Sequence, residues 1–171
     1  KCPANHASHI SFSRHSVPGL WGGLISLSSA GSSLKWFKNK CLPGGEELDY
    51  KTLDDECCKR LLHNQGLIFY PYMTASNYPC ATKDKGGTFI GLSFIHDIYD
   101  MALSVMEGIV FQTAWMLEAV CGNGLSSIKM TGGATNSKLW VQLVANVTGL
   151  PIQIPSVADM GCVGAAMLAG I

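Results

Sequence analysis

The stretch Thr131-Gly132-Gly133-Ala134-Thr135-Asn136-Ser137-Lys138-Leu139-Trp140 decides the fold, because it joins a strand pattern to a helix pattern through two glycines. Residues 127–130 alternate polar and apolar, as a half-buried strand does. After the glycines, apolar residues recur at the spacing of one helix face: Leu139, Trp140, Leu143, Val144 and Val147. We predict a strand over 125–131, a helix over 137–148 and, between them, backbone that a ligand can approach closely. A tight turn without a ligand is the alternative.

Composition narrows the class of protein. The chain has 171 residues, of which 47% are hydrophobic and 14% charged, so it can bury a sizeable core and is not a disordered segment. The net charge is zero, so the chain has no excess of positive charge that would attract nucleic acid or an anionic membrane. The longest apolar region, 101–121, contains Glu107, Gln112 and Glu118 and is predicted to be a buried helix, not a membrane span. So few charges suggest that another domain or subunit covers part of the surface, and a homodimer is possible.

The seven cysteines indicate a reducing compartment. Their number is odd, and neither a Cys-x-x-Cys pair nor a nearby histidine has the spacing of a metal site. We interpret them as free thiols of a cytoplasmic protein, since no secretory signal opens the chain.

The chain starts without Met and stops within an apolar helical pattern, so we expect a fragment of a longer protein, truncated at both ends.

Helices and strands alternate along the chain, most clearly in its second half. This order predicts an α/β domain with a parallel or mixed sheet flanked by helices. Ser29 and Asp97 are predicted helix N-caps. Helices are expected over 29–40, 49–64, 98–121, 137–148 and from 160, and strands over 10–14, 66–71, 87–94, 125–131 and 152–154, with 19–27 either strand or loop.

Five blocks, in order, resemble the FGGY family of carbohydrate kinases. One is Gly-Thr-Phe-Ile-Gly-Leu followed after seven residues by Asp-Met-Ala-Leu-Ser-Val-Met-Glu-Gly. The others are an Ala-Gly-x-x-x-x-Trp helix start, a Pro-Tyr loop, the Gly-Gly turn before Ser-x-Leu-Trp, and a closing Gly-Ala-Ala helix. Two departures occur: Ala75-Ser76-Asn77 replaces Gly-Glu-Arg, and Ala134 replaces a third glycine. The first block named lies at 87–92 with 100–108. The other four, in the order named, lie at 29–36, 69–79, 131–140 and 159–166.

The resemblance implies an actin-like ATPase (ribonuclease H-like) fold. The whole of 1–171 would be the C-terminal, nucleotide-side domain of a kinase that uses ATP and Mg²⁺ to phosphorylate a small sugar or polyol. The sugar-binding N-terminal domain, which carries the catalytic base in this family, would be absent, so no catalytic residue is expected here. Xylulose, ribulose, gluconate and glycerol types share these blocks.

The resemblance also implies nucleotide-contacting residues. Gly31 would bring a helix-start amide to the phosphates, and Lys35, one turn on, would cover the adenine. Gly132 and Gly133 would lie against purine and ribose. Asn136 belongs to the same turn, and Ser137 would hydrogen-bond the adenine. The alternatives are a packed turn at the glycines, a solvated Lys35 and a simple N-cap at Ser137.

Other functions stay open at this point. A non-catalytic actin-like domain that binds nucleotide or a regulatory partner is the main alternative, and a metabolite-binding α/β module is a third. Glu107, inside an apolar helix, is interpreted as a structural acceptor more than as a site or hinge residue. His96 and Asp97 resemble a catalytic pair, but a cap explains Asp97 and a loop explains His96 better.

Overall fold

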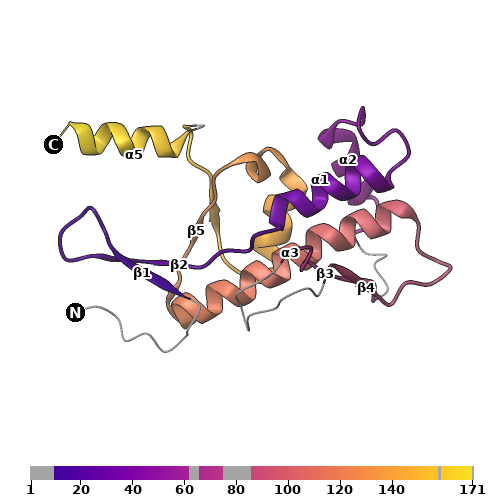
Figure 1. Ribbon diagram of the computed structural model, residues 1–171, viewed down its shortest axis with the longest axis horizontal. Helices are drawn as coiled ribbons and strands as arrows, with labels where there is room; N and C mark the ends of the chain where they lie inside the picture. Colours follow the sequence, from indigo (N-terminus) through magenta and orange to yellow (C-terminus); the bar gives the residue numbers. More distant parts are fainter. Residues whose placement is uncertain (1–9, 62–65, 75–85, 158, 171) are drawn as a thin grey trace.

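The computed structural model describes residues 10–61, 66–74, 86–157 and 159–170, and its centre is the long helix α3, Ile98–Cys121 (Figure 1). Asp97 caps this helix as predicted. Its carboxylate accepts hydrogen bonds from the amides of Tyr99 (2.8 Å) and Asp100 (2.9 Å), while the Asp100 carboxylate accepts from the Asp97 amide at 2.7 Å. This reciprocal capping box satisfies amides that the first turn leaves unpaired. The helix ends at Cys121, and the C-cap residue Gly122 has a φ of 55°.

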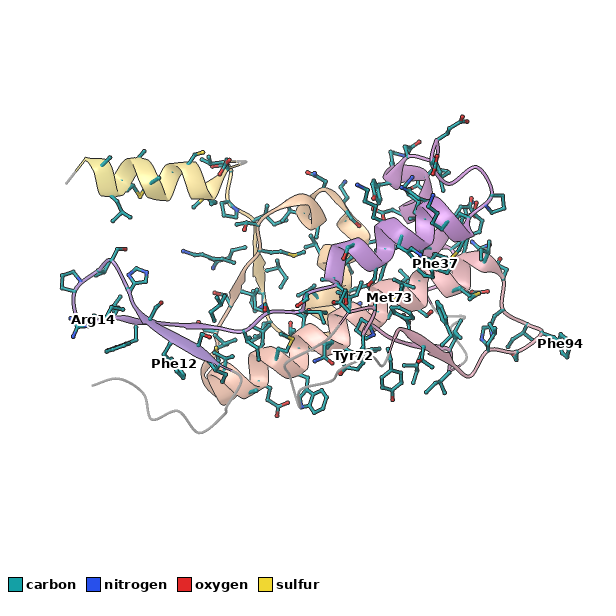
Figure 2. All side chains as sticks on the ribbon, in the orientation of Figure 1. Phe12, Arg14, Phe37, Tyr72, Met73 and Phe94 are labelled. Carbon is teal, nitrogen blue, oxygen red and sulfur yellow. The ribbon has the colours of Figure 1, made fainter. Side chains whose placement is uncertain are left out.

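Three further helices pack around α3: α1 (Ala30–Cys41), α2 (Tyr50–Cys58) and α4 (Lys138–Thr148). Their apolar faces meet in one core, as the helical spacing predicted. Phe37, a residue of α1, lies inside this core (Figure 2). The buried members of the core are Leu34, Phe37, Leu42, Leu53, Cys57, Phe69, Ala102, Leu103, Val105, Met106, Ile109, Val110, Leu139, Trp140, Leu143 and Val144.

Two of the predicted helix starts and ends need correction. The Ser29 side chain does not cap α1; its hydroxyl donates to the Pro71 carbonyl at 2.6 Å and ties the start of α1 to the end of a strand. Helix α2 is capped by Asp49, which accepts from the Thr52 amide at 2.7 Å, and it ends at Cys58. The predicted continuation to residue 64 passes through a turn at 59–61, and 62–65 lie outside the described residues.

The described strands form three separate pairs. β1 (Ser11–Arg14) with β2 (Trp21–Leu24) and β3 (Ile68–Tyr70) with β4 (Thr88–Ile90) are antiparallel, and β5 (Ile128–Lys129) with β6 (Ile152–Gln153) is parallel. The α/β class is confirmed, and 19–27 contains a strand. Within the described residues the strands do not join into one mixed sheet, because each has a single partner. Residues 91–94, predicted as strand, leave β4 in a loop that carries the fully exposed Phe94 to the tip of the molecule (Figure 2).

The last helix, α5 (Met160–Ala169), is apolar but packs against little of the chain. Asp159 caps it by accepting from the Cys162 amide at 3.0 Å. Met167 and Leu168 are 67% and 55% exposed. The helix extends from the same side of the molecule as the β1–β2 hairpin (Figure 1). Exposed apolar side chains gathered on one face are typical of an interaction surface.

Helix α3 is also the one helix in the described ranges that is long and apolar enough to cross a membrane by length and composition. Half of its most apolar 18-residue window is buried inside the molecule. Leu103, Val105 and Met106 are all fully buried by neighbouring elements, as expected of a core helix.

Candidate functional site

The parallel strands β5 and β6 end beside each other at a small cavity of about 220 Å³. The Ile128 amide donates to the Pro151 carbonyl (2.9 Å) and the Met130 amide to the Gln153 carbonyl (3.0 Å), so the two carboxyl ends are held together. Loops at the carboxyl ends of parallel strands form ligand sites in α/β folds. The cavity is lined by Met130, Thr131, Gly132, Thr135, Asn136, Ile154, Pro155, Ser156 and Val157.

The Gly-Gly turn forms one wall of this cavity. Gly132 has a φ of 87°, a left-handed conformation that favours glycine, and a short 3₁₀ helix follows over Gly133–Asn136. The Gly132 carbonyl accepts from both the Thr135 amide (3.1 Å) and the Thr135 hydroxyl (2.7 Å). Ser137 then caps α4, accepting from the Trp140 amide at 3.0 Å. The strand–turn–helix order predicted from the sequence is therefore confirmed.

The space above the turn is open. A β-carbon added at Gly133 would meet no described atom within 4 Å, and the φ of Gly133 is not in the left-handed region. Neither packing nor backbone conformation within the described chain therefore requires glycine at this position. A glycine that the fold does not need is consistent with a ligand lying against its backbone.

The six predicted contact residues fall into two groups. Gly132 and Asn136 line the cavity, and Gly133 and Ser137 flank it in the same turn. Gly31 and Lys35 are exposed on the first turns of α1, a separate helix, and are not among the described residues that line the cavity. A β-carbon at Gly31 would also meet no described atom within 4 Å.

The opposite wall, 154–157, was not predicted as part of the site. The sequence predicts a strand over 152–154 and a helix from 160, and no site residue between them. The available signal was the strand order: if 128–131 and 152–154 are parallel neighbours, the residues after each must meet at one edge. Ser156 and Thr135 thus add hydroxyl groups to the cavity.

A carboxylate from α2 lies next to the start of α4. Asp54 is half-buried, and burial raises its pKa above the ordinary value, while a hydrogen bond from the Ser137 hydroxyl acts in the opposite direction. No sequence pattern indicates this contact, because a charged residue on a helix of mixed composition resembles a solvated one.

The two other candidates from the sequence lie away from the cavity. Glu107 is half-buried on α3, between fully buried neighbours, and its structural role stays a prediction. His96 lies in the loop before α3, where its Nδ1 accepts from the Ser93 amide at 3.0 Å, and Asp97 is the helix cap. The interpretation of this pair as loop and cap is confirmed. The altered residues 75–77 lie outside the described residues.

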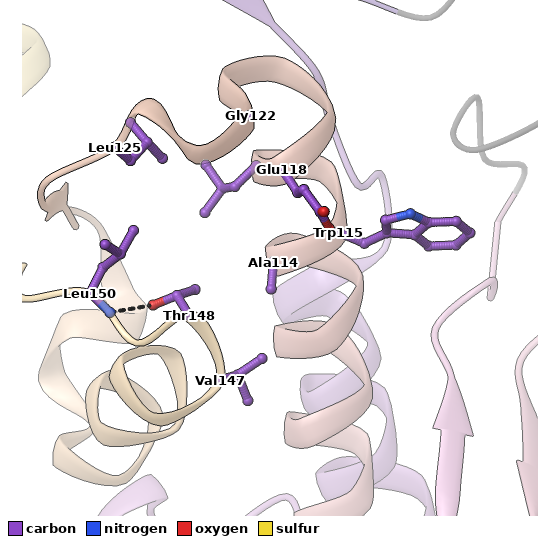
Figure 3. Close-up of a pocket in the computed structure, with 9 residues that line it drawn as sticks. Ala114, Trp115, Glu118, Gly122, Leu125, Val147, Thr148 and Leu150 are labelled. Carbon is purple, nitrogen blue, oxygen red and sulfur yellow. Dashed lines mark hydrogen bonds between the residues drawn. The ribbon is translucent and has the colours of Figure 1, made fainter.

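A larger cavity, about 420 Å³, lies between the C-terminal ends of α3 and α4 (Figure 3). Its lining residues are Ala114, Trp115, Leu117, Glu118, Gly122, Leu125, Val147, Thr148 and Leu150. Glu118 is the one charged group in this lining, so phosphate would find an unfavourable charge there. The smaller cavity, beside the Gly-Gly turn and the start of α4, has the better chemistry for a nucleotide.

Comparison with known proteins agrees with this architecture. Residues 2–171 match the FGGY family of carbohydrate kinases, C-terminal domain, and the chain belongs to this family. It is 30% identical over 147 residues to a probable L-xylulose kinase of Haemophilus influenzae, covering 84% of this chain and 28% of that kinase.

Solved structures show the same fold. A xylulose kinase from Brucella ovis superposes with a TM-score of 0.78 at 26% identity, covering 94% of this chain and 34% of that one. The Plasmodium falciparum glycerol kinase solved with ADP gives a TM-score of 0.71 at 22% identity, covering 88% of this chain and 29% of that one. These relatives have the actin-like ATPase fold, and this chain spans about a third of their length.

Proposed function

We propose that the protein containing this chain transfers the γ-phosphoryl group of ATP to a hydroxyl of a small sugar or polyol. The observation that carries the proposal is the open backbone at Gly133, beside the cavity where β5 and β6 end. Family membership supports it, since the relatives are named xylulose and glycerol kinases.

In this proposal the chain supplies the nucleotide wall of the active site. The purine and ribose lie against Gly132 and Gly133, and Asn136 and the Ser137 hydroxyl provide polar contacts. Gly31, at the start of α1, presents backbone amides to phosphate, and the helix dipole favours negative charge there. The Lys35 stem covers the base. Such a wall accelerates phosphoryl transfer by holding ATP in line with the acceptor.

Mg²⁺ would accompany the nucleotide and neutralise charge on its phosphate oxygens. Across the described residues, no group of three or more His, Cys, Asp or Glu side chains is placed to hold a metal ion. We therefore assign no Mg²⁺ ligand to this chain. The base that removes the acceptor proton belongs, in this proposal, to the other domain, and the protein acts in the cytoplasm, alone or as a homodimer.

The test is a substrate screen on the full-length protein with ATP, Mg²⁺ and a panel of pentuloses, gluconate and glycerol. We expect phosphorylation of at least one acceptor and none by residues 1–171 alone. ATP binding without turnover on any acceptor would favour the alternative, a regulatory actin-like domain. Absence of nucleotide binding in the folded full-length protein would overturn the proposal.

A further inference from the structure

The cavity of about 420 Å³ between the C-terminal ends of α3 and α4 lies outside the proposed nucleotide wall (Figure 3). Helix α4 joins the two places, because it begins after the Gly-Gly turn and ends at Thr148, which lines this cavity. Its 11 residues span about 16 Å, so a small molecule in the cavity would not overlap a nucleotide at the turn. The cavity is therefore a separate candidate site.

Apolar side chains form most of the cavity wall. Ala114, Val147 and Leu125 surround the open space, whereas the Trp115 ring points away from it (Figure 3). Cavities of roughly 300–1,000 Å³ with mainly apolar walls are typical of small-molecule sites. A molecule with a hydrocarbon or aromatic body fits this wall. The apolar members of the lining are Ala114, Leu117, Leu125, Val147 and Leu150.

The charge at this cavity is negative. Glu118 is the one charged side chain among the described residues that line it, and none of the ion pairs between described residues includes Glu118. Two helices also end here, and the C-terminus of a helix carries a partial negative charge. Neither α3 nor α4 has a basic residue in its last turn, whereas α1 has Lys38 and Lys40 in its own. No side chain of α3 or α4 therefore compensates the negative charge at their ends.

The polar groups at the cavity accept hydrogen bonds more readily than they donate them. The Thr148 hydroxyl donates its proton to the Val144 carbonyl at 2.7 Å, so toward a ligand it can only accept. The Leu150 amide is used, because it donates to that hydroxyl at 3.4 Å, and the Gly122 amide donates to the Glu118 carbonyl. An ammonium group has three donors and no acceptor, so it matches these groups better than a carboxylate does.

We propose that this cavity binds a small organic cation, with a primary ammonium group at Glu118 and the two helix ends, and an apolar body against Ala114, Leu125 and Val147. Attraction to the carboxylate and to the helix ends favours the ammonium group over a neutral or anionic one. Burial of the body against the apolar wall adds the hydrophobic contribution. The site goes beyond the proposed function, since none of these residues belongs to the nucleotide wall.

The test measures dissociation constants of three probes of similar size by NMR titration of the full-length protein at pH 7 and low salt. The probes are phenethylamine, which is cationic, phenethyl alcohol, which is neutral, and phenylacetate, which is anionic. The wild type should bind the amine about fivefold more tightly than the alcohol, and phenylacetate most weakly. This preference should shrink at about 0.5 M NaCl, because salt screens charges near the surface. Equal affinities for amine and alcohol would overturn the proposal.

Glu118→Gln tests the role of the charge. The variant should fold at least as stably as the wild type, because a carboxylate near a helix C-terminus opposes the helix dipole. Its affinity for the amine should fall about threefold, while its affinity for the alcohol stays the same. Glu47→Gln is the matched control, since Glu47 is exposed in the loop before α2 and does not line the cavity. An equal loss of amine affinity in Glu47→Gln would assign the effect to net charge and contradict the proposal.

Ala114→Phe tests the location, because its ring would fill the space that the probe occupies. The folded variant should lose binding of both amine and alcohol, and unchanged amine binding would show that the amine binds elsewhere. If Ala114→Phe does not fold, Leu125→Trp, on the loop side of the cavity, should have the same effect. None of these measurements uses a nucleotide, so failure of the proposed function leaves the test intact. A wild type that binds no probe would overturn this inference alone.

Discussion

Gly108 of α3 lies directly against the backbone of Phe69 in β3. A β-carbon at position 108 would overlap the Phe69 carbonyl oxygen and lie 3.4 Å from the Phe69 Cβ. This close approach lets the long central helix pack onto the β3–β4 pair, and Phe69 is buried in the core beside it. Packing against β3 thus requires the glycine of the Glu-Gly step at 107–108.

The first prediction concerns this contact. Gly108→Ala should lower the free energy of unfolding by about 1–3 kcal/mol, because the methyl group must displace backbone, which yields less readily than a side chain. Urea unfolding of the full-length protein measures it. Gly164→Ala in α5 is the control: its β-carbon would meet no described atom within 4 Å, so helix propensity alone should make it neutral or stabilising. Equal midpoints for wild type and Gly108→Ala would show that the packing can relax.

The second prediction concerns the Gly-Gly turn. Gly133→Val should leave the fold intact, because the space above Gly133 is open, but a branched side chain would occupy the volume proposed for the purine. We expect nucleotide affinity to fall at least about 10-fold, equivalent to about 1.4 kcal/mol. Calorimetric titration of the full-length variant with an ATP analogue measures this loss.

Gly124→Val provides a comparison for that experiment, since Gly124 is equally open but lies outside the turn. It should bind nucleotide like the wild type. Unchanged affinity in a folded Gly133→Val protein would mean that the turn is structural only.

The third prediction follows from the Arg60–Asp97 ion pair, in which Nη2 lies 2.5 Å from Oδ2. Burial by itself would raise the Asp97 pKa, but hydrogen bonds from Arg60 and from the amides of Asp100 and Tyr99 lower it overall. A folded-state pKa below the unfolded value gives stability that is complete above the unfolded pKa of about 3.9 and is lost as pH falls through the folded pKa.

Urea unfolding from pH 7 to pH 3 checks this sign. The wild type should lose stability as pH falls below about 4, whereas Asp97→Asn should be less stable at pH 7 and show a flatter acid limb. Asp55→Asn, at the exposed pair with Lys51, should retain the wild-type slope. An acid limb in Asp97→Asn as steep as in the wild type would assign the acid sensitivity to other carboxylates.

The fourth prediction concerns the thiols. Five of the seven cysteines lie in the described residues and all five are free: Cys41, Cys57, Cys58, Cys121 and Cys162. Cys2 and Cys80 lie outside the described residues. Denatured, unreduced protein should therefore titrate with about seven thiols. Finding three disulfides would contradict the prediction of a reducing compartment.

Native protein should react more slowly at one of these positions. Burial, assisted by the charge of Asp54, raises the pKa of Cys57 to about 12, so its reactive thiolate is scarce at pH 8. Cys57→Ser should leave the fast phase of native thiol labelling unchanged and remove one slow equivalent. Loss of a fast equivalent would show that α2 opens readily.

The sequence by itself determined the features that depend on neighbours along the chain. The cap at Asp97, the cap at Ser137 and the helices that follow them are local, because capping and helical spacing involve residues three or four positions apart. The Gly-Gly turn was recognisable for the same reason. The family resemblance added the fold, since the short strands carry too little pattern to indicate how they pair.

Only the tertiary structure decided which distant groups meet. Ser29 resembles an N-cap, yet its hydroxyl donates to Pro71, because the packing of α1 against the end of β3 offers that carbonyl at 2.6 Å. The same holds for Asp54 beside Ser137 and for the wall at 154–157 that faces the Gly-Gly turn. Contacts of this kind depend on how helices and strands pack in three dimensions, and neither periodicity nor capping chemistry encodes them.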